Sequence, residues 1–197
     1  GIRLISANRP QNRFHAYDTS KDHIIKSAER SLKNLHTDFL DVLLIHRPDP
    51  LMEADEIAKA FLQLRKAGKV RHFGVSNFTP FQFELLQSRL DFPLVTNQVE
   101  VSVLHMDALH DGTLDQCQQR RVCPMAWSPL GGGRLFIGNS EQQVRVRNLL
   151  AEIGSEHNGM SADQVALAWL LWHPSNMIPV LGTGNMERIH GAKGAID

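Results

Sequence analysis

Residues 39–50, Phe-Leu-Asp-Val-Leu-Leu-Ile-His-Arg-Pro-Asp-Pro, set a nearly continuous apolar run directly against a polar turn. A short apolar run of this kind is typical of a strand that is buried on both faces of a parallel sheet. Apolar residues at helical spacing flank it over 20–35 and 54–66, and Gly68 stands where the second helix is expected to end. The stretch therefore predicts a helix, a buried strand and a second helix.

The same alternation continues outward from this stretch to the C-terminal end. Strands are expected at 70–75, 93–99, 122–127 and 177–181, helices at 79–90, 109–120, 141–156, 161–172 and from 185, and a loop at 128–138. Thr79-Pro80 is typical of a helix start, because Thr caps the helix and Pro at the first helical position loses no useful N–H. Gly112 weakens the helix expected around it.

Strands that alternate with helices at intervals of about 30 residues predict an α/β fold around a parallel sheet. A closed (β/α)8 barrel needs about 250 residues, whereas the chain has 197, with five strand–helix repeats and a strand tail at 1–5. We therefore expect an incomplete TIM barrel, roughly strands 4–8 with their helices. It would form one domain over 1–197 that lacks about three β/α units and the C-terminal end. An open doubly wound sheet also fits this pattern.

Composition excludes several classes of protein. Lys+Arg and Asp+Glu both total 21, so the formal net charge is zero, and we expect no nucleic-acid partner. The apolar runs are too short to span a membrane, and no signal peptide is visible. Cys117 and Cys123 make no disulfide framework and are expected to be buried thiols in a reducing cytoplasm. None of the ten histidines has metal-site spacing, so we expect no metal. The sequence does not fix an oligomeric state.

Polar and aromatic residues stand where strands of the expected barrel end, which is where barrels carry their functional groups. His46, Ser76, Asn77, Gln98 and Trp127 lie at these positions. His46 also has a plainer interpretation as a solvated or otherwise satisfied imidazole, and Ser76 and Asn77 could simply cap the helix that follows. We expect these side chains to meet around one ligand.

Two glycine-rich segments follow the last two expected strands. Glycines at 131–133 let backbone N–H groups approach a phosphate, although such a loop is more often only flexible. Residues 181–188, Leu-Gly-Thr-Gly-Asn-Met-Glu-Arg, run into a helix whose exposed N–H groups and positive end outline an anion site together with Arg188. The string lacks the third small residue of a Rossmann fingerprint, which weakens the doubly wound alternative.

Taken in chain order, residues 43–49, 68–78, 97–100 and 127–133 resemble the aldo-keto reductase superfamily, in particular bacterial oxidoreductases near the potassium-channel β-subunit branch. The resemblance covers essentially the whole chain. It implies an enzyme that reduces aldehydes or ketones to alcohols by hydride transfer from NADPH, with NADH as the alternative cofactor and a small carbonyl compound as substrate. It also implies a cytoplasmic protein.

The resemblance implies a role for each residue of the cofactor site. Ser76, Asn77 and Gln98 would bind the nicotinamide carboxamide, and Trp127 would stack on the nicotinamide ring. The pyrophosphate would be lined by Ser128, Leu130 and Gly132, and the adenosine phosphate would be bound by Gly182, Thr183, Gly184 and Arg188. Many members carry Lys-Ser in place of Gly182-Thr183, and the adenine contacts fall on Gly191 and Ala192, so the preference for NADPH rests on Arg188.

Of the four catalytic residues that members use, only His46 is matched in this chain. The Asp, Tyr and Lys would fall before Gly1, and Tyr17 is assigned to a loop. A phenol with a pKa near 10 needs a nearby ammonium to act as an acid at neutral pH. We therefore expect His46 to orient a carbonyl and the chain by itself to be inactive. A nucleotide-binding regulatory or scaffold protein of the same fold is the alternative function, and an inert fragment the third.

Overall fold

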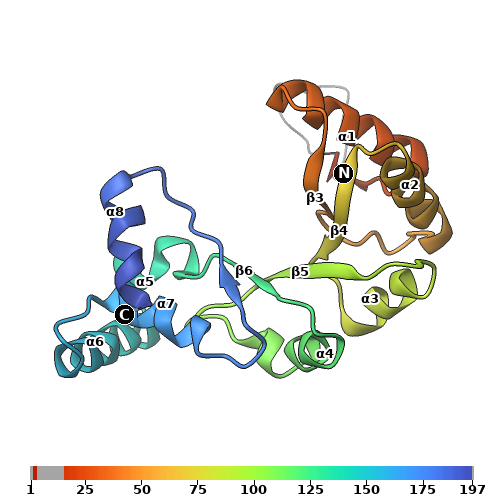
Figure 1. Cartoon of the computed structure of the whole chain (residues 1–197). Coiled ribbons are helices and arrows are strands. Elements are labelled where there is room, and N and C mark those ends of the chain that lie inside the picture. Colours follow the sequence, from red (N-terminus) through yellow and green to blue (C-terminus); the bar gives the residue numbers. More distant parts are fainter. Residues whose placement is uncertain (1, 4–15, 197) are drawn as a thin grey trace. The chain divides into compact units, whose positions relative to one another are not determined.

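The computed structural model describes residues 2–3 and 16–196, and the chain forms two compact units, with unit 1 ending at Asn97 and unit 2 beginning at Gln98 (Figure 1). Unit 1 contains β1 (Ile2–Arg3), β2 (Ala16–Tyr17), α1 (Lys21–Leu35), β3 (Leu40–Ile45), α2 (Ala54–Lys66), β4 (Val70–Ser76), α3 (Pro80–Gln87) and the start of β5 (Leu94–Glu100). The chain passes into unit 2 inside β5.

Unit 2 continues the alternation of strands and helices. After the end of β5 it contains η1 (Asp107–Leu109), α4 (Thr113–Arg120), β6 (Met125–Trp127), η2 (Gly131–Gly133), α5 (Arg134–Ile137), α6 (Glu141–Glu156), α7 (Ala162–Leu171), β7 (Ile178–Pro179), α8 (Met186–Gly191) and η3 (Ala192–Ala195). The strand order is β3-β4-β5 in unit 1 and β5-β6-β7 in unit 2. Because β3 pairs with β4, β5 with β6, and β6 with β7 in parallel, the prediction of an α/β fold on a parallel sheet is confirmed.

Helices α1 and α2 lie side by side in unit 1 (Figure 1). Helix α1 buries Ile24, Ala28 and Leu32, which recur every four residues and so share one face. Helix α2 buries Phe61, whose ring stacks on Phe73 of β4 with a centroid distance of 4.2 Å. The buried residues of both helices thus recur at the helical spacing that the sequence predicts. The contact between Phe61 and Phe73 places β4 in the core of unit 1.

Strand β3 is less buried than its apolar sequence predicts. Asp41 is exposed and Val42 is 45% exposed, and only Ile45 is fully buried. The expectation of burial on both faces is therefore wrong for the described chain. β3 stands at the end of the strand order and has β4 as its single neighbour among the described strands, so its other edge meets no described strand.

Several boundaries differ from those expected. The helix expected at 109–120 begins only at Thr113, because Gly112, directly before it, adopts the left-handed conformation with φ 85°, which a right-handed helix does not contain. The expected loop at 128–138 contains α5. Helix α3 ends at Gln87 rather than at residue 90, and β7 holds two residues of the expected 177–181.

The N-terminal strand and one cysteine also differ from expectation. β1 pairs with β2 in antiparallel fashion, whereas a parallel barrel strand was expected there; Gly1, Leu4 and Ile5 lie outside the described residues. Cys117 is buried and burial raises the pKa of its thiol to about 12, but Cys123 is exposed. Val122 and Pro124 are buried on both sides of Cys123, so the alternating burial of this segment leaves its side chain in solvent.

Unit 2 has two apolar clusters. One contains Val99, Leu114, Ala126 and Leu170, and the other contains Leu135, Leu150, Val165 and Ala166. Leu130, which directly precedes the glycine-rich turn, packs against both clusters. The turn is therefore anchored to the core by the residue directly before it.

Among the described helices, none is both long and apolar enough to cross a bilayer. The described residues also contain no group of three or more His, Cys, Asp or Glu side chains that could hold a metal ion.

Candidate functional site

The ends of β3 and β4 bring three predicted residues together in unit 1. His46 follows β3, Ser76 is the last residue of β4, and Asn77 comes next with a left-handed φ of 59°. The Asn77 Nδ2 donates a hydrogen bond of 2.8 Å to the Ser76 Oγ and makes a longer contact of 3.4 Å with the His46 carbonyl oxygen. Ser76 is buried whereas His46 is exposed. These strand ends thus form one polar cluster at the edge of unit 1.

A buried side chain that was not predicted as a site residue holds the loop after this cluster. Asn97 of β5 has no exposed surface, and its Nδ2 donates to the Phe78 carbonyl oxygen at 2.8 Å. The Phe78 N–H in turn donates to the Asn97 Oδ1 at 3.4 Å. Asn97 therefore pairs with both backbone polar groups of one residue, Phe78, in the way that a neighbouring strand would. In the sequence, only the position of Asn97 next to Gln98, within residues 97–100, pointed to a role in holding this loop.

The surroundings of His46 disfavour protonation of its imidazole. Desolvation of its covered part and the positive charge of Arg47 lower the pKa of His46 below its usual value. A neutral imidazole can donate or accept one hydrogen bond at each ring nitrogen, depending on the tautomer. This matches the expected role of orienting a carbonyl and does not supply a strong acid.

Gln98 and Trp127 lie on neighbouring strands of unit 2. In the parallel pair of β5 and β6, Gln98 is opposite Met125 and Glu100 is opposite Trp127. Residues two apart on a strand, and those directly opposite on its neighbour, share a face of the sheet. Gln98 and Trp127 therefore point to the same face, which is the face away from Val99 and Ala126 in the core.

A pocket of about 520 Å³ in unit 2 gathers most of the predicted phosphate residues. Its lining includes Ser128, Leu130, Gly132, Gly182, Thr183 and Arg188, while Gly184 is not part of it. Two segments that are about 50 residues apart in the sequence thus form the walls of one cavity. Asp163 of α7 and Phe136 and Ile137 of α5 also line it and were not predicted, because no motif marks a pocket wall contributed by a helix.

The turn after β6 is tightly wound. Gly131, Gly132 and Gly133 have φ values of 62°, 62° and 86°, and Ser128 has a φ of 50°. The Gly131 N–H donates to the Ser128 carbonyl oxygen at 2.8 Å. A Cβ on Gly131 would lie 3.0 Å from the Leu104 Cδ1. Glycine is therefore needed here both for the backbone conformation and for the space.

The N-terminus of α8 is less open than the sequence predicts. The Asn185 Oδ1 accepts hydrogen bonds from the backbone N–H groups of Glu187 and Arg188, at 2.8 and 3.2 Å. The expectation of exposed N–H groups there is wrong for these two, because the N-cap side chain already occupies them. The guanidinium of Arg188 is exposed and makes no hydrogen bond or ion pair within the described part of the chain. It is the free positive charge of the pocket.

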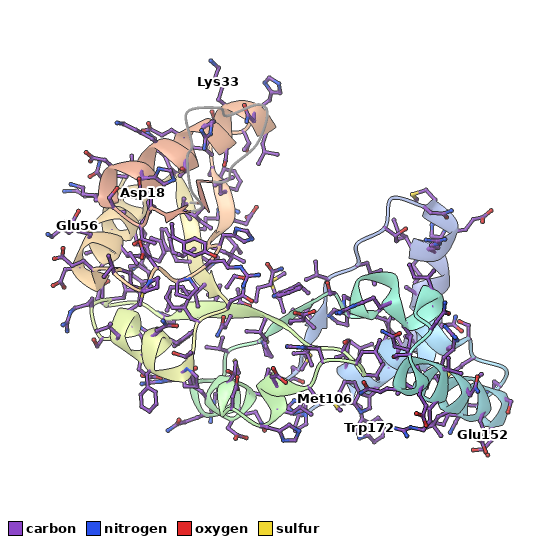
Figure 2. All side chains as sticks on the ribbon, turned by 180° about the vertical axis from the view of Figure 1, so that it is seen from behind. Asp18, Lys33, Glu56, Met106, Glu152 and Trp172 are labelled. Carbon is purple, nitrogen blue, oxygen red and sulfur yellow. The ribbon has the colours of Figure 1, made fainter. Side chains whose placement is uncertain are left out.

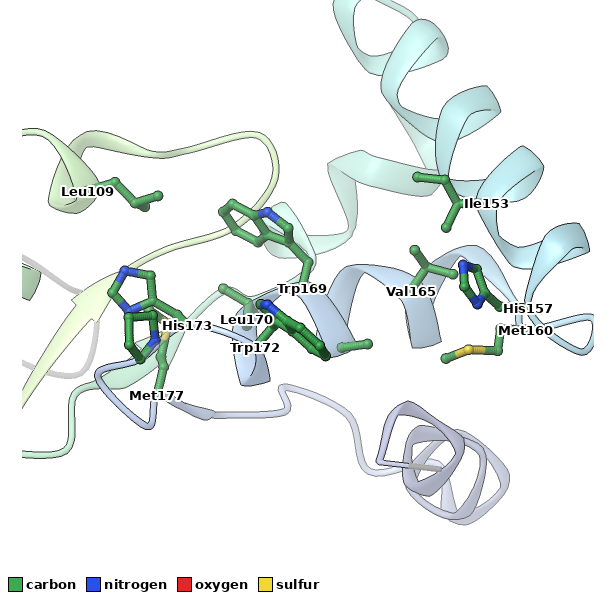
Figure 3. A pocket seen from close by; sticks show the side chains of 12 residues that line it. Leu109, Ile153, His157, Met160, Val165, Trp169, Leu170, Trp172, His173 and Met177 are labelled. Carbon is green, nitrogen blue, oxygen red and sulfur yellow. The ribbon is translucent and has the colours of Figure 1, made fainter.

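A second pocket in unit 2, of about 500 Å³, is almost wholly apolar (Figure 3). It lies along α7 and is lined by Trp169, Trp172, Met160 and Met177 among others. Trp172 is 90% exposed and stands out from the surface (Figure 2). None of the predicted site residues lines this pocket, so it belongs to no part of the site described above.

Comparison with known proteins gives a consistent result. The model of the aldo/keto reductase family matches residues 5–197. The oxidoreductase YdhF of Escherichia coli is 60% identical over 96% of this chain and 63% of its own length. A 6-dehydroglucose reductase of Agrobacterium fabrum is 48% identical over 100% of this chain and 65% of its own length. The chain thus spans somewhat less than two thirds of these relatives.

The fold comparison agrees. The crystal structure of the thermostable aldo-keto reductase Tm1743 with the inhibitor epalrestat matches with a TM-score of 0.82 and 32% identity, and it covers 90% of this chain and 62% of that one. The sequence-based prediction of part of an α/β barrel of this family is thereby confirmed.

Proposed function

The chain belongs to the aldo/keto reductase family, and we propose that it binds a nicotinamide nucleotide with the phosphate groups in the pocket of unit 2. The observation that carries this proposal is the lining of the pocket. Ser128, Leu130, Gly132, Gly182, Thr183 and Arg188 were assigned to the nucleotide from sequence alone, and all six line one cavity.

The residues present fit such a ligand. Glycines leave the backbone of both walls accessible, and the hydroxyls of Ser128 and Thr183 add side-chain donors. The guanidinium of Arg188, which has no partner among the described residues, supplies a positive charge with the planar donor geometry that phosphate oxygens favour. The roles of Ser76, Asn77, Gln98 and Trp127 at the nicotinamide end, and of Gly184, stay predictions from the resemblance.

The activity that we propose for the whole protein is reduction of aldehydes or ketones to alcohols. When bound, the nucleotide supplies the hydride. His46, which is exposed at the end of β3 and has a lowered pKa, would hold the carbonyl oxygen by a hydrogen bond. The expected Asp, Tyr and Lys partners have no match in this chain, so turnover is proposed for a polypeptide of the relatives' length. The reductase name of the Agrobacterium relative supports this reaction class.

NADPH is the proposed cofactor. Arg188 would pair with the extra phosphate group of NADPH, which NADH lacks. Gly182 contributes no charge, and the carboxylate of Asp163, which also lines the pocket, repels the negative charge of the phosphates. We therefore propose a preference for NADPH that is moderate and sensitive to salt.

Titration of the chain with NADPH and with NADH, followed by calorimetry and tryptophan fluorescence, tests the proposal. We expect saturable binding with quenching, and about tenfold weaker binding for Trp127→Ala, because one stacking contact on an aromatic face is worth about 1–3 kcal/mol. Trp172→Phe is the matched control, since Trp172 lies at the other pocket. Unchanged affinity in Trp127→Ala would remove the stacking role, and no saturable binding of either nucleotide would defeat the proposal.

Turnover is tested separately in a polypeptide of the relatives' full length. We expect oxidation of NADPH that depends on an added aldehyde or ketone. If the nucleotide is retained tightly without such oxidation across a broad panel of carbonyl compounds, the regulatory or scaffold alternative is favoured instead.

A further inference from the structure

The segment from Gly131 to Gly138 forms one wall of the nucleotide pocket proposed above. Gly132, Gly133, Phe136 and Ile137 all face the cavity. The wall consists of a glycine turn and a helix of four residues, and neither is stable by itself. Consecutive glycines lose more backbone entropy on ordering than any other residues, and one helical turn does not pay for its own nucleation. Something outside the segment must hold it.

Arg134 holds the first end of this wall. Its Nε donates to the Gly131 carbonyl oxygen at 2.9 Å, and its Nη2 lies 3.7 Å from the Glu100 Oε1 at the end of β5. The carboxylate of Glu100 is mostly covered, with 21% of its side chain exposed, and the His105 Nε2 lies 4.0 Å from its other oxygen. Arg134 is not among the residues that line the cavity. It therefore acts on the pocket through the turn.

Arg147 holds the other end. From helix α6, its Nη1 donates to the carbonyl oxygens of Leu135 and Gly138, at 3.1 and 3.3 Å, and also to that of Phe136. The last carbonyl groups of a helix have no partner within the helix, and in α5 these groups make up most of its length. Arg147 thus satisfies acceptors that would otherwise need water, and it ties α5 to α6.

We propose that Arg134, through its pairing with Glu100, and Arg147 are positioning residues that keep the wall from Gly131 to Gly138 in the shape that receives the nucleotide phosphates. The inference rests on the proposed function for the identity of the ligand. Holding the turn in place before binding removes the cost of ordering it at the moment of binding, and this raises affinity without a further contact to the ligand. Specificity between NADPH and NADH is not affected, because neither arginine lies in the cavity.

A competing account makes Arg134 a direct phosphate contact. The two accounts predict opposite results for Glu100→Gln. If Arg134 acts through the turn, loss of the Glu100 charge loosens its hold and weakens binding. If Arg134 binds phosphate directly, loss of a competing carboxylate leaves binding unchanged or strengthens it.

The experiment compares wild type with Arg134→Lys, Glu100→Gln and Arg147→Lys, and uses Arg145→Lys as the control. Arg145 lies on the same helix as Arg147, is exposed, and makes no contact of this kind within the described residues. Lysine keeps the charge and loses the forked donor geometry. Calorimetry with NADPH and with NADH gives affinities, and hydrogen exchange of the backbone amides of 131–138 in the nucleotide-free chain reports on the wall alone.

We expect Arg134→Lys and Arg147→Lys to weaken the binding of both nucleotides about tenfold, by loss of one charge-assisted hydrogen bond each. Glu100→Gln should weaken it by a smaller factor. Amide exchange over 131–138 should become faster in all three variants and stay unchanged in Arg145→Lys. Unchanged exchange in the arginine variants, or undiminished affinity in Glu100→Gln, would overturn the proposal. If the wild-type chain binds no nucleotide, the proposed function is wrong. The amide exchange rates would still show whether Arg134 and Arg147 hold the wall.

Discussion

The loop that follows β4 in unit 1 is held by a buried side chain, whereas the loop that follows β6 in unit 2 is held by partly exposed ones. Asn97 makes two hydrogen bonds to the backbone N–H and carbonyl oxygen of Phe78 and has no exposed surface of its own. Arg134 leaves more than half of its side chain in solvent while it holds Gly131. A buried pair resists water and salt, whereas an exposed ionic pair competes with both. The loop after β4 should therefore stay in place at any salt concentration, whereas the hold of Arg134 on the turn after β6 should weaken as the salt concentration rises.

The largest expected effect on stability comes from removing the side chain of Asn97, which holds the loop after β4. In Asn97→Ala, the Phe78 N–H and carbonyl groups, which lie in the core, lose their partner. Buried polar groups without a partner cost about 1–3 kcal/mol each, so we expect a loss of about 3 kcal/mol in the free energy of unfolding. Denaturant unfolding measures it, with the exposed Asn148→Ala as control. A loss below about 1 kcal/mol would show that this loop is held by other contacts.

Gly74 in unit 1 and Gly182 in unit 2 differ in the space that surrounds them. A Cβ on Gly74 of β4 would lie 2.7 Å from both the Leu44 Cδ2 and the Thr96 carbonyl oxygen, whereas one on Gly182 would meet nothing within 4 Å. We expect Gly74→Ala to lower the free energy of unfolding by about 2 kcal/mol, since the strands must move apart. Gly182→Ala should change it by less than about 0.5 kcal/mol. Equal effects in denaturant unfolding would contradict the contrast between a packed strand and an open pocket wall.

Arg188→Ala tests the charge of the pocket. We expect NADPH to bind about tenfold less tightly and NADH nearly as before, because one exposed guanidinium–phosphate pair is lost. Calorimetry at two salt concentrations would measure the ratio of the dissociation constants. Arg145→Ala should leave that ratio unchanged. An equal loss for both nucleotides would place Arg188 at the shared part of the ligand instead.

The smallest expected effect concerns the pH dependence of stability at His46. Partial burial of the imidazole and the positive charge of Arg47 lower the pKa of His46 in the folded chain. The unfolded chain therefore binds the proton more readily. The His46 contribution is therefore fully present above the ordinary pKa near 6.5 and is lost as the pH falls from there to the folded value. The slope of unfolding free energy against pH over that window should be more positive in wild type than in His46→Gln. An NMR titration of the imidazole that gives a pKa above 6.5 would refute this.

Much of the fold followed from local sequence because apolar spacing records which face of each element is buried. The buried residues Ile24, Ala28 and Leu32 of α1 stand at the positions that the helical pattern marked, and the Thr79-Pro80 start of α3 forms a capping box with Gln82. Boundaries were less certain where one residue competes with the pattern. The left-handed Gly112 interrupts an expected helix, and α5 forms inside an expected loop.

The sequence by itself determined the alternation of strands and helices, the family, and six residues that line one pocket of unit 2, since these depend on short motifs and local spacing. Only the tertiary structure decided which backbone N–H groups are already hydrogen-bonded and which loops depend on a side chain from elsewhere for their conformation. Asn185 caps the amides that the motif offered to an anion, and Asn97, Arg134 and Arg147 act on residues 3 to 19 positions away. Such contacts form between side chains and backbone groups that the fold brings together, and no local pattern encodes them.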